Sequence, residues 1–345
     1  MNAISKLRQS RAVRTPSARA TASMIRLVLA LLLLCPAYQA YCEAPSHLGR
    51  VHFLIPAGPG GGWDGTARGV GEALLKSGLV ANISYENLSG GGGGRAIAKL
   101  IETAGRQGNT LMVNSTPIVV RSLQKIFPQS FRDLTPIASV IADYGCFVVR
   151  KDSPYSDWGE IIAAFQSDAR SIKVAGGSVR GSTDHLVIAK AIKEAGMDPR
   201  QVRYVPYDGG GRAMTGLLTG ETQLLSTGLS ETLDLANAGE VKIIATTAPA
   251  RLPEIPGVPT LKELGYELIF ANWRGFFGPP GMSSERIHSS IDVLTELMQT
   301  EEFEAVRARN GWAILFQSGA EFYRFLEQQE RDIGQMMRDL GFLKS

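Results

Sequence analysis

The sequence contains few of the residues that build metal centres and disulfide frameworks. Its 345 residues include three cysteines and four histidines. The HExxH pattern of zinc enzymes is absent, and only Cys146 lies clear of the N-terminal segment considered next. We therefore expect no metal site, no cofactor and no disulfide framework.

Acidic residues are missing from the first 42 positions, which contain six basic residues. A short apolar run at 27–35 leads into Ala37, Ala40 and Ala44. A basic start, a short apolar core and small residues are typical of a secretory signal peptide. The run is shorter than the roughly 20 residues that span a bilayer. We predict a signal peptide at 1–42, with a membrane anchor or a lipoprotein at Cys35 as weaker alternatives.

The remainder of the chain has no excess of basic charge. The whole chain has 36 lysines and arginines against 33 acids, a formal charge of +3. Without the six bases of the signal segment, 30 remain against 33 acids, a net charge of −3. The sequence therefore gives no reason to expect a nucleic-acid partner.

Long hydrophobic runs are also absent, and short apolar strands alternate with amphipathic helices instead. The predicted strands lie at 51–55, 83–86, 110–113, 172–175, 202–205, 223–226 and 241–246. Further β-rich stretches lie at 137–150, with a break near Tyr144 and Gly145, and at 268–278. We expect a turn-filled connection at 249–259 and two closing helices at 287–297 and 322–337. Such alternation favours βαβ units and parallel sheets.

The alternation stops and restarts, which predicts two α/β units with the second inserted into the first. We place lobe 1 at 48–143 plus 272–345 and lobe 2 at 144–271, joined by two crossing strands. A ligand would bind in the cleft between such lobes.

Glycine is the abundant residue, with 38 in the chain. Many of the glycines follow predicted strands, in loops at 56–64, 87–94, 176–182 and 207–212. In a parallel sheet these loops gather at the carboxyl edge, where open α/β folds bind ligands. Glycine backbones and helix N-termini together form a site suited to an anion.

One glycine loop matches the dinucleotide fingerprint. The pattern G-x-G-x-x-G occurs at 60–65, and Glu86 ends the next predicted strand. Trp63 and Asp64, however, stand where the helix amides would meet a pyrophosphate, and a carboxylate there would repel it. We therefore do not expect a nucleotide.

The same loops do not assemble a convincing nucleophile. Ser178 follows a glycine, but Arg180 stands where the G-x-S-x-G elbow needs its last glycine. Ser182, Asp184 and His185 are neighbours in sequence, which is no evidence for a triad assembled in space. We expect His185 to be a core or capping residue of a helix, and we predict no catalytic residue.

At these loops the chain resembles a known family. The segments are IPAGPGGGWD at 55–64, NLSGGGGG at 87–94, VNSTP at 113–117, AGGSVRGSTDHL at 175–186, VPYDGGG at 205–211 and WRGFFGPPG at 273–281. They resemble the extracytoplasmic solute receptors of tripartite tricarboxylate transporters, also called Bug receptors. Trp63 and the five-glycine loop are most similar to the citrate-type branch.

The resemblance implies an α/β fold like that of type II periplasmic binding proteins, with two lobes that close on a solute. It also implies a small di- or tricarboxylate ligand, a periplasmic location and membrane transporter subunits as partners, without enzymatic activity. An exported enzyme acting on an acidic metabolite, or a sensor of the same fold, are the alternatives.

Carried over by position, the resemblance implies two sets of ligand-binding residues. One jaw would consist of Gly58, Gly60, Gly61, Trp63, Asp64, Asn87, Ser89 and Gly90. The other would consist of Ser178, Arg180, Gly181, Ser182, Tyr207, Asp208 and Gly209. Asn114 and Ser115 would end a strand inside the cleft.

Several of these residues have structural alternatives. Asp64 could cap a helix, Trp63 could pack beneath its loop, and Asn114 and Ser115 could stabilise a turn. Arg180 could bind a carboxylate bidentately or pair with Asp184. Arg212 and Arg274 could each contact the ligand, or they could cap a helix or bridge the lobes.

Overall fold

The computed structural model describes residues 48–344. The predicted signal peptide, including Cys35, lies outside this range. Within the described range, none of the helices combines the length and the apolar character needed to cross a membrane.

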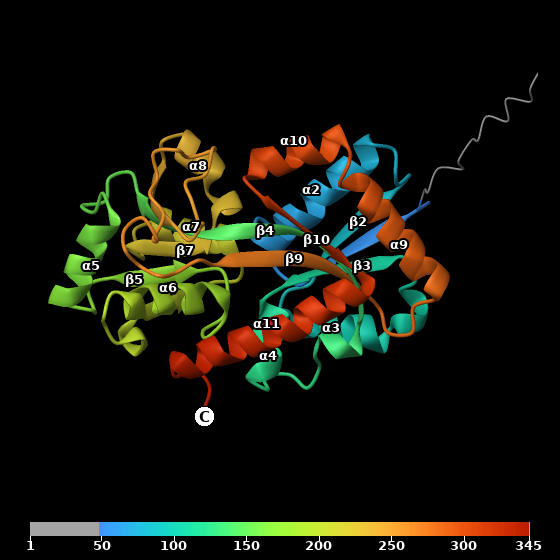
Figure 1. Cartoon of the computed structure of the whole chain (residues 1–345), viewed down its shortest axis with the longest axis horizontal. Coiled ribbons are helices and arrows are strands. Elements are labelled where there is room, and N and C mark those ends of the chain that lie inside the picture. The colour runs from blue at the N-terminus through green and yellow to red at the C-terminus, as the bar shows by residue number, and fades with distance from the viewer. Residues whose placement is uncertain (1–47, 345) are drawn as a thin grey trace, which may run out of the picture. The chain divides into compact units, whose positions relative to one another are not determined.

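The first sheet begins with three parallel strands (Figure 1). They are β1 (Val51–Ile55), β2 (Ile83–Asn87) and β3 (Thr110–Ser115), in the order β2-β1-β3. The connections contain α2 (Gly62–Lys76) and α3 (Gly94–Glu102), and α4 (Pro117–Leu123) follows β3. The apolar face of α2 is buried through Ala67, Val70 and Leu74, as the periodicity of the sequence predicts.

The second sheet repeats this arrangement in a later part of the chain. Its strands are β5 (Lys173–Gly176), β6 (Arg203–Pro206), β7 (Leu224–Gly228) and β8 (Val241–Thr246), of which β6, β5 and β7 are parallel neighbours. Its helices are α5 (Trp158–Ser167), α6 (Thr183–Glu194), α7 (Gly210–Leu218) and α8 (Leu233–Asn237). The stretch 249–259 contains turns and no helix or strand, as expected.

Two long strands connect the sheets, β4 (Thr135–Arg150) and β9 (Ala271–Gly278), and they run antiparallel side by side (Figure 1). Up to Tyr144, β4 pairs with β9, whereas from Gly145 onward it pairs with β7 and β8. The two-lobed α/β class with crossing strands is therefore confirmed. We retain 48–143 with 272–345 and 144–271 as the proposed lobes, because β4 changes partners at this point.

Three expectations need correction. The predicted break near Tyr144 and Gly145 is wrong, because β4 is one strand of 16 residues that exchanges its partners there. The sheets are mixed rather than parallel throughout, since β9 is antiparallel to β3 and β4. The closing region contains α9 (Ser284–Leu297), α10 (Glu301–Asn310), β10 (Ala313–Ser318) and α11 (Gly319–Asp339) rather than two helices. Helix α10 was not predicted because its sequence has no apolar stripe, and only Phe303 and Val306 of this helix are buried.

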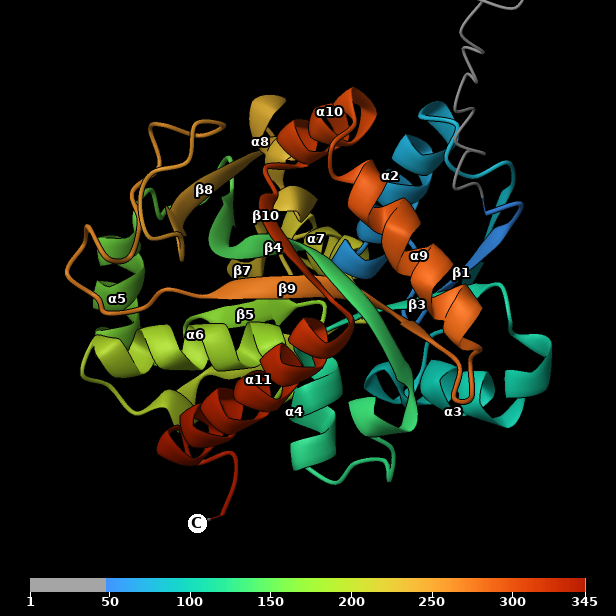
Figure 2. The ribbon, with the colours of Figure 1, turned by 45° about the vertical axis from the view of Figure 1, so that its right-hand side comes forward.

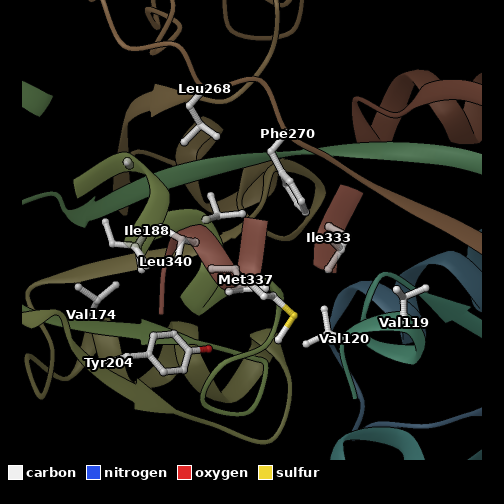
Figure 3. Close-up of a cluster of buried hydrophobic side chains, with 14 of the residues drawn as sticks. Val119, Val120, Val174, Ile188, Tyr204, Leu268, Phe270, Ile333, Met337 and Leu340 are labelled. Atoms are coloured by element: carbon white, nitrogen blue, oxygen red, sulfur yellow. The ribbon is translucent and has the colours of Figure 1, made fainter. Parts of the chain in front are cut away.

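A buried cluster joins helices that flank both sheets (Figure 3). Helix α11 runs beside α4 (Figure 2) and contributes Ile333 and Met337 to this cluster. Ile188 of α6 belongs to the same cluster, and Lys193 Nζ donates to the carbonyl of Asp339 at 2.9 Å. The C-terminal helix therefore packs across the boundary between the proposed lobes.

Candidate functional site

A cavity of about 350 Å³ lies where the carboxyl ends of the strands of both sheets meet. The residues after β1, β2 and β3 line it from one side, and those after β5, β6 and β7 line it from the other. The first residues of α2, α6 and α7 also reach it, namely Gly62, Thr183 and Gly210. Three helix N-termini therefore direct free N–H groups and positive dipole ends to one space.

The walls of the cavity are partly apolar. Pro56, Val187 and Phe270 line it together with the indole of Trp63. The Trp63 ring is held in place because its Nε1 donates to Oγ of Ser115, a residue at the end of β3, at 2.8 Å. Trp63 therefore forms part of the wall, one of its two predicted roles, and Ser115 fixes its orientation.

The N-terminus of α6 presents two unused hydroxyl groups. Ser182 and Thr183 are buried and line the cavity, and neither hydroxyl has a hydrogen-bond partner among the described residues. The preceding loop is fixed independently of them. The Ser178 amide donates to Asp184 Oδ2 at 2.9 Å, and Ser178 Oγ accepts from the Asp184 amide at 3.0 Å. Buried hydroxyls are usually hydrogen-bonded. A ligand with acceptor atoms could supply the missing partners at this helix N-terminus.

Arg274 of β9 lines the cavity beside the buried Asp143 and the partly buried Glu231. Its Nη2 is 3.5 Å from Asp143 Oδ2 of β4 and 4.0 Å from Glu231 Oε1 of the 3₁₀ turn η5 (Leu229–Glu231). Asp143 also accepts from the amide of Ser230 at 3.2 Å and from its hydroxyl at 2.7 Å. Glu231 accepts from the Thr227 hydroxyl at 2.6 Å.

Burial dominates the acid–base properties of this cluster. It raises the pKa of Glu231 to about 7 and the pKa of Asp184 to about 6, although Arg274 opposes both shifts. Burial raises the pKa of Asp143 as well, against the attraction of Arg274. Because desolvation penalises the charged form, the cavity contains carboxyl groups that can hold protons near neutral pH.

The two sides of the cavity are in direct contact. Ser89, after β2, donates a hydrogen bond to Asp208 Oδ1, after β6. Gln124 Nε2, after α4, donates to the carbonyl of Gly181 before α6 at 2.9 Å. These bonds join loops of the two sheets, so the structure corresponds to an arrangement in which the cleft is closed.

The structure places ten of the predicted ligand-binding residues on the cavity lining. They are Gly61, Trp63, Ser89, Gly90, Ser115, Ser178, Ser182, Tyr207, Asp208 and Gly209. The other seven do not line it: Gly58, Gly60, Asp64, Asn87, Asn114, Arg180 and Gly181. The residue assignments remain predictions, and the lining separates those that can touch a ligand from those that can act only through neighbours.

Asp64 and Asn87 stabilise the first glycine loop instead of lining the cavity. Asp64 is not the N-cap of α2, a position held by Gly61. Its Oδ2 accepts from the Gly60 amide at 3.0 Å, and its Oδ1 accepts from Asn87 Nδ2 at 3.0 Å. Asn87 also donates to the carbonyl of Ala57 at 3.0 Å. The carboxylate therefore points into the loop and away from the cavity.

Arg180 forms no ion pair with Asp184 among the described residues, and its contact with a ligand stays a prediction. Its side chain is exposed, is absent from the lining, and donates to the backbone carbonyl of Tyr204. Asp184 binds the Ser178 amide rather than Arg180. His185 is buried, stacks on Tyr204, and accepts from the Gly181 amide through Nδ1 at 2.9 Å, as expected of a core residue.

Sequence reasoning missed Asp143, Thr183 and Glu231, and it left Arg274 undecided. Glu231 lies shortly after the predicted strand at 223–226, so the rule that located the glycine loops could have found it. Asp143 gives no such signal, because it lies inside a long apolar strand. Arg274 likewise lies within β9, and its partners become visible only when β4 and η5 are placed beside it.

Comparisons with known proteins agree on one family. The sequence profile described as "Tripartite tricarboxylate transporter family receptor" matches residues 67–342. The protein BugT of Bordetella pertussis is 27% identical over 267 residues, which cover 76% of this chain and 80% of BugT.

Solved structures show the same fold at lower sequence identity. A Rhodopseudomonas palustris protein with adipate has a TM-score of 0.77 at 22% identity, covering 85% of this chain and 97% of that protein. MatC from the same organism, with bound malate, has a TM-score of 0.74 at 21% identity, covering 83% of this chain and 98% of MatC.

Proposed function

Because this chain belongs to the receptor family of tripartite tricarboxylate transporters, we propose that it binds a small di- or tricarboxylate in the cavity between its lobes. In this proposal the chain is exported to the periplasm by its N-terminal segment. It then delivers the ligand to the membrane subunits of a tripartite transporter. No covalent step is involved.

The observation that carries this proposal is the start of α6. Ser182 and Thr183 line the cavity at the N-terminus of a helix of 12 residues, and their buried hydroxyls have no hydrogen-bond partner within residues 48–344. A carboxylate can accept from both hydroxyls and is attracted by the positive end of the helix dipole. Exclusion of water by the closed lobes strengthens these charge-assisted hydrogen bonds.

The size and lining of the cavity support a small ligand. Its volume of about 350 Å³ lies near the lower end of the range for small-molecule sites, about 300–1,000 Å³. The apolar walls near Trp63 and Phe270 suit the carbon skeleton of such an acid. Malate and adipate, the ligands of the two structural neighbours, are therefore the first candidates. Citrate is tested beside them because the loop sequences are most similar to the citrate-type branch.

The test is calorimetric titration of the protein lacking residues 1–42 with malate, adipate, citrate and a set of amino acids. We expect saturable binding of at least one di- or tricarboxylate and weaker binding of the amino acids. Failure of every carboxylate to bind would refute the proposal. Tighter binding of an amino acid would refute the proposed ligand class.

A further inference from the structure

The position of Glu231 is unusual for a residue in a site that should attract anions. Its carboxyl group lies between the first residues of two helices, α2 and α7. A Cβ atom on Gly62 would lie 2.6 Å from Glu231 Oε1, and one on Gly210 would collide with Oε2. A carboxyl group of the protein itself therefore occupies the space between two of the three helix N-termini.

The three acids around the cavity differ in how well their charge is compensated. Asp143 has two hydrogen bonds from Ser230 and lies 3.5 Å from the Arg274 guanidinium. Asp184 accepts from the Ser178 amide and lies in the first turn of α6. Glu231 has the Thr227 hydroxyl, while Arg274 stands 4.0 Å away, beyond hydrogen-bond distance. Glu231 thus has the weakest compensation from side chains, to which the positive ends of α2 and α7 add.

The charged groups that act on Glu231 come from three elements. Arg274 of β9 attracts its negative charge, whereas Asp184 of α6 and Asp143 of β4 repel it. Cys146 of β4 also faces this cluster, and burial raises the pKa of its thiol so that it stays neutral. Other charged groups on the helices packed against η5 interact with groups other than Glu231. On α2, Arg68 pairs with Asp64 and Lys76 pairs with Glu72. On α10, Arg307 pairs with Glu304 and Arg309 pairs with Glu72, while Asp234 of α8 lies near Arg309.

Charge balance then determines what happens when an anion enters. With Asp143, Asp184 and Glu231 all ionised, the cluster has three negative charges and one positive charge, from Arg274. A dicarboxylate would add two more negative charges to a space from which water is excluded. Like charges at such short range cannot all remain ionised. The acid with the weakest compensation from side chains, Glu231, is the first candidate to take up a proton.

We propose that Glu231 is a specificity-determining residue of the cavity, which takes up one proton when the carboxylate ligand binds and then donates a hydrogen bond toward it. The proton comes from the solvent and joins a Glu231 carboxyl oxygen, and it returns to the solvent on release. This inference rests on the proposed function, because it requires a carboxylate in the cavity.

The direction of the pH dependence follows from this linkage. Burial gives Glu231 a pKa of about 7 before the ligand enters, and the negative ligand raises it further. Below pH 7 the proton is already present, so this group adds no pH dependence. Above pH 7 each binding event must take up a proton, and the affinity falls by about tenfold per pH unit as long as the complex remains protonated.

The test is titration calorimetry of the signal-free protein with malate or adipate, whichever binds more tightly, between pH 6.5 and 8.5. Each pH is measured in buffers of different ionisation enthalpy, so that the slope of heat against ionisation enthalpy counts protons. We expect uptake of close to one proton at pH 8 and a loss of affinity above pH 7. In Glu231→Gln the amide supplies the donor permanently, so we expect no uptake and, at pH 8.5, tighter binding than in the native protein.

Two further variants assign the proton. Glu240→Gln removes an exposed glutamate that pairs with Lys151, and it should retain the native pH profile. Asp184→Asn removes the other acid with a pKa near neutrality, and uptake at pH 8 should persist. Binding without proton uptake, or uptake that persists in Glu231→Gln, would overturn the inference while leaving the proposed function intact. Absence of any carboxylate binding would overturn both. Thermal melting of each variant confirms that it is folded.

Discussion

Substitution of Gly61 should separate ligand affinity from fold stability. Gly61 precedes α2 in lobe 1, and an added Cβ atom would lie 3.1 Å from the backbone nitrogen of Gly210 and 3.5 Å from the Cα of Gly209, both in lobe 2. Its φ of −99° is open to any residue, so the substitution causes no backbone strain. The conflict arises only where the two lobes meet.

The size of the effect follows from that contact. A Cβ at 3.1 Å from a backbone atom forces the lobes apart by a few tenths of an ångström, and overpacking of this kind costs about 1–3 kcal/mol. For Gly61→Ala we expect the lower end, about 1 kcal/mol or a fivefold loss of affinity. For Gly61→Val, with two more methyl groups in the contact, we expect about 2–3 kcal/mol, a loss of roughly 30- to 150-fold.

The assay compares three quantities for each variant. Calorimetry gives the affinity, small-angle scattering gives the ligand-induced change in radius of gyration, and thermal melting without ligand gives the stability. Gly65→Ala is the matched control, because Gly65 is exposed in the same helix and an added Cβ would touch nothing within 4 Å. We expect the control to bind normally and to gain about 0.5–1 kcal/mol of stability. If Gly61→Val bound the ligand with native affinity, the reasoning that Gly61 allows the two lobes to close would be refuted.

Four other substitutions test separate parts of the argument. Ser182→Ala should weaken carboxylate binding by about 1.5–3 kcal/mol without lowering stability, because this hydroxyl has no partner in the part of the chain that the structure describes. The contrasting variant Ser283→Ala should lower stability by about 1 kcal/mol with unchanged affinity, since Ser283 caps α9. Phe322→Ala should reduce the free energy of unfolding in guanidinium by about 3–5 kcal/mol, because Phe322 is fully buried, and a loss below 1 kcal/mol would contradict the assigned packing. Burial, with the nearby charge of Arg180, lowers the pKa of His185 to about 4, so the unfolded chain binds more protons between about pH 4 and 6.5. Stability should therefore fall by about 2 kcal/mol from pH 7 to pH 5 through this residue, and denaturation curves of His185→Phe should lack that component.

The positions of the strands and of the glycine loops were predictable because they depend on local patterns. The predicted strands at 51–55 and 241–246 agree with β1 and β8, since a short run of β-forming residues between turn residues needs no distant partner to be recognised. The loops after β2 and β5 reach the cavity because parallel strands place their carboxyl ends at one edge. Helix α10 was missed because it has no continuous apolar face. Strand β10 was missed although its sequence begins with an apolar run at 313–316.

The side-chain partners within the loops could not be predicted in the same way. Arg180 carries a charge in a glycine loop, which suggested a ligand contact, yet its guanidinium donates to the Tyr204 carbonyl. Asp64 occupies a position compatible with a helix cap, yet its carboxylate holds Gly60 and Asn87. The direction of a side chain depends on which acceptor is nearest in three dimensions, and the sequence does not contain that distance.

The sequence by itself determined the class of this protein: a chain that is slightly acidic beyond residue 42 and is built from two α/β units with glycine loops suited to an anion. The tertiary structure alone decided the chemistry inside the cavity. Asp143 and Arg274 are separated by 131 positions in the chain, and they meet Glu231 only because β4 and β9 cross between the sheets beside η5. The raised pKa values of Asp143 and Glu231 follow from burial, which the charge of Arg274 opposes. Burial and the proximity of these charges are properties of the assembled fold, because no residue is buried in the extended chain.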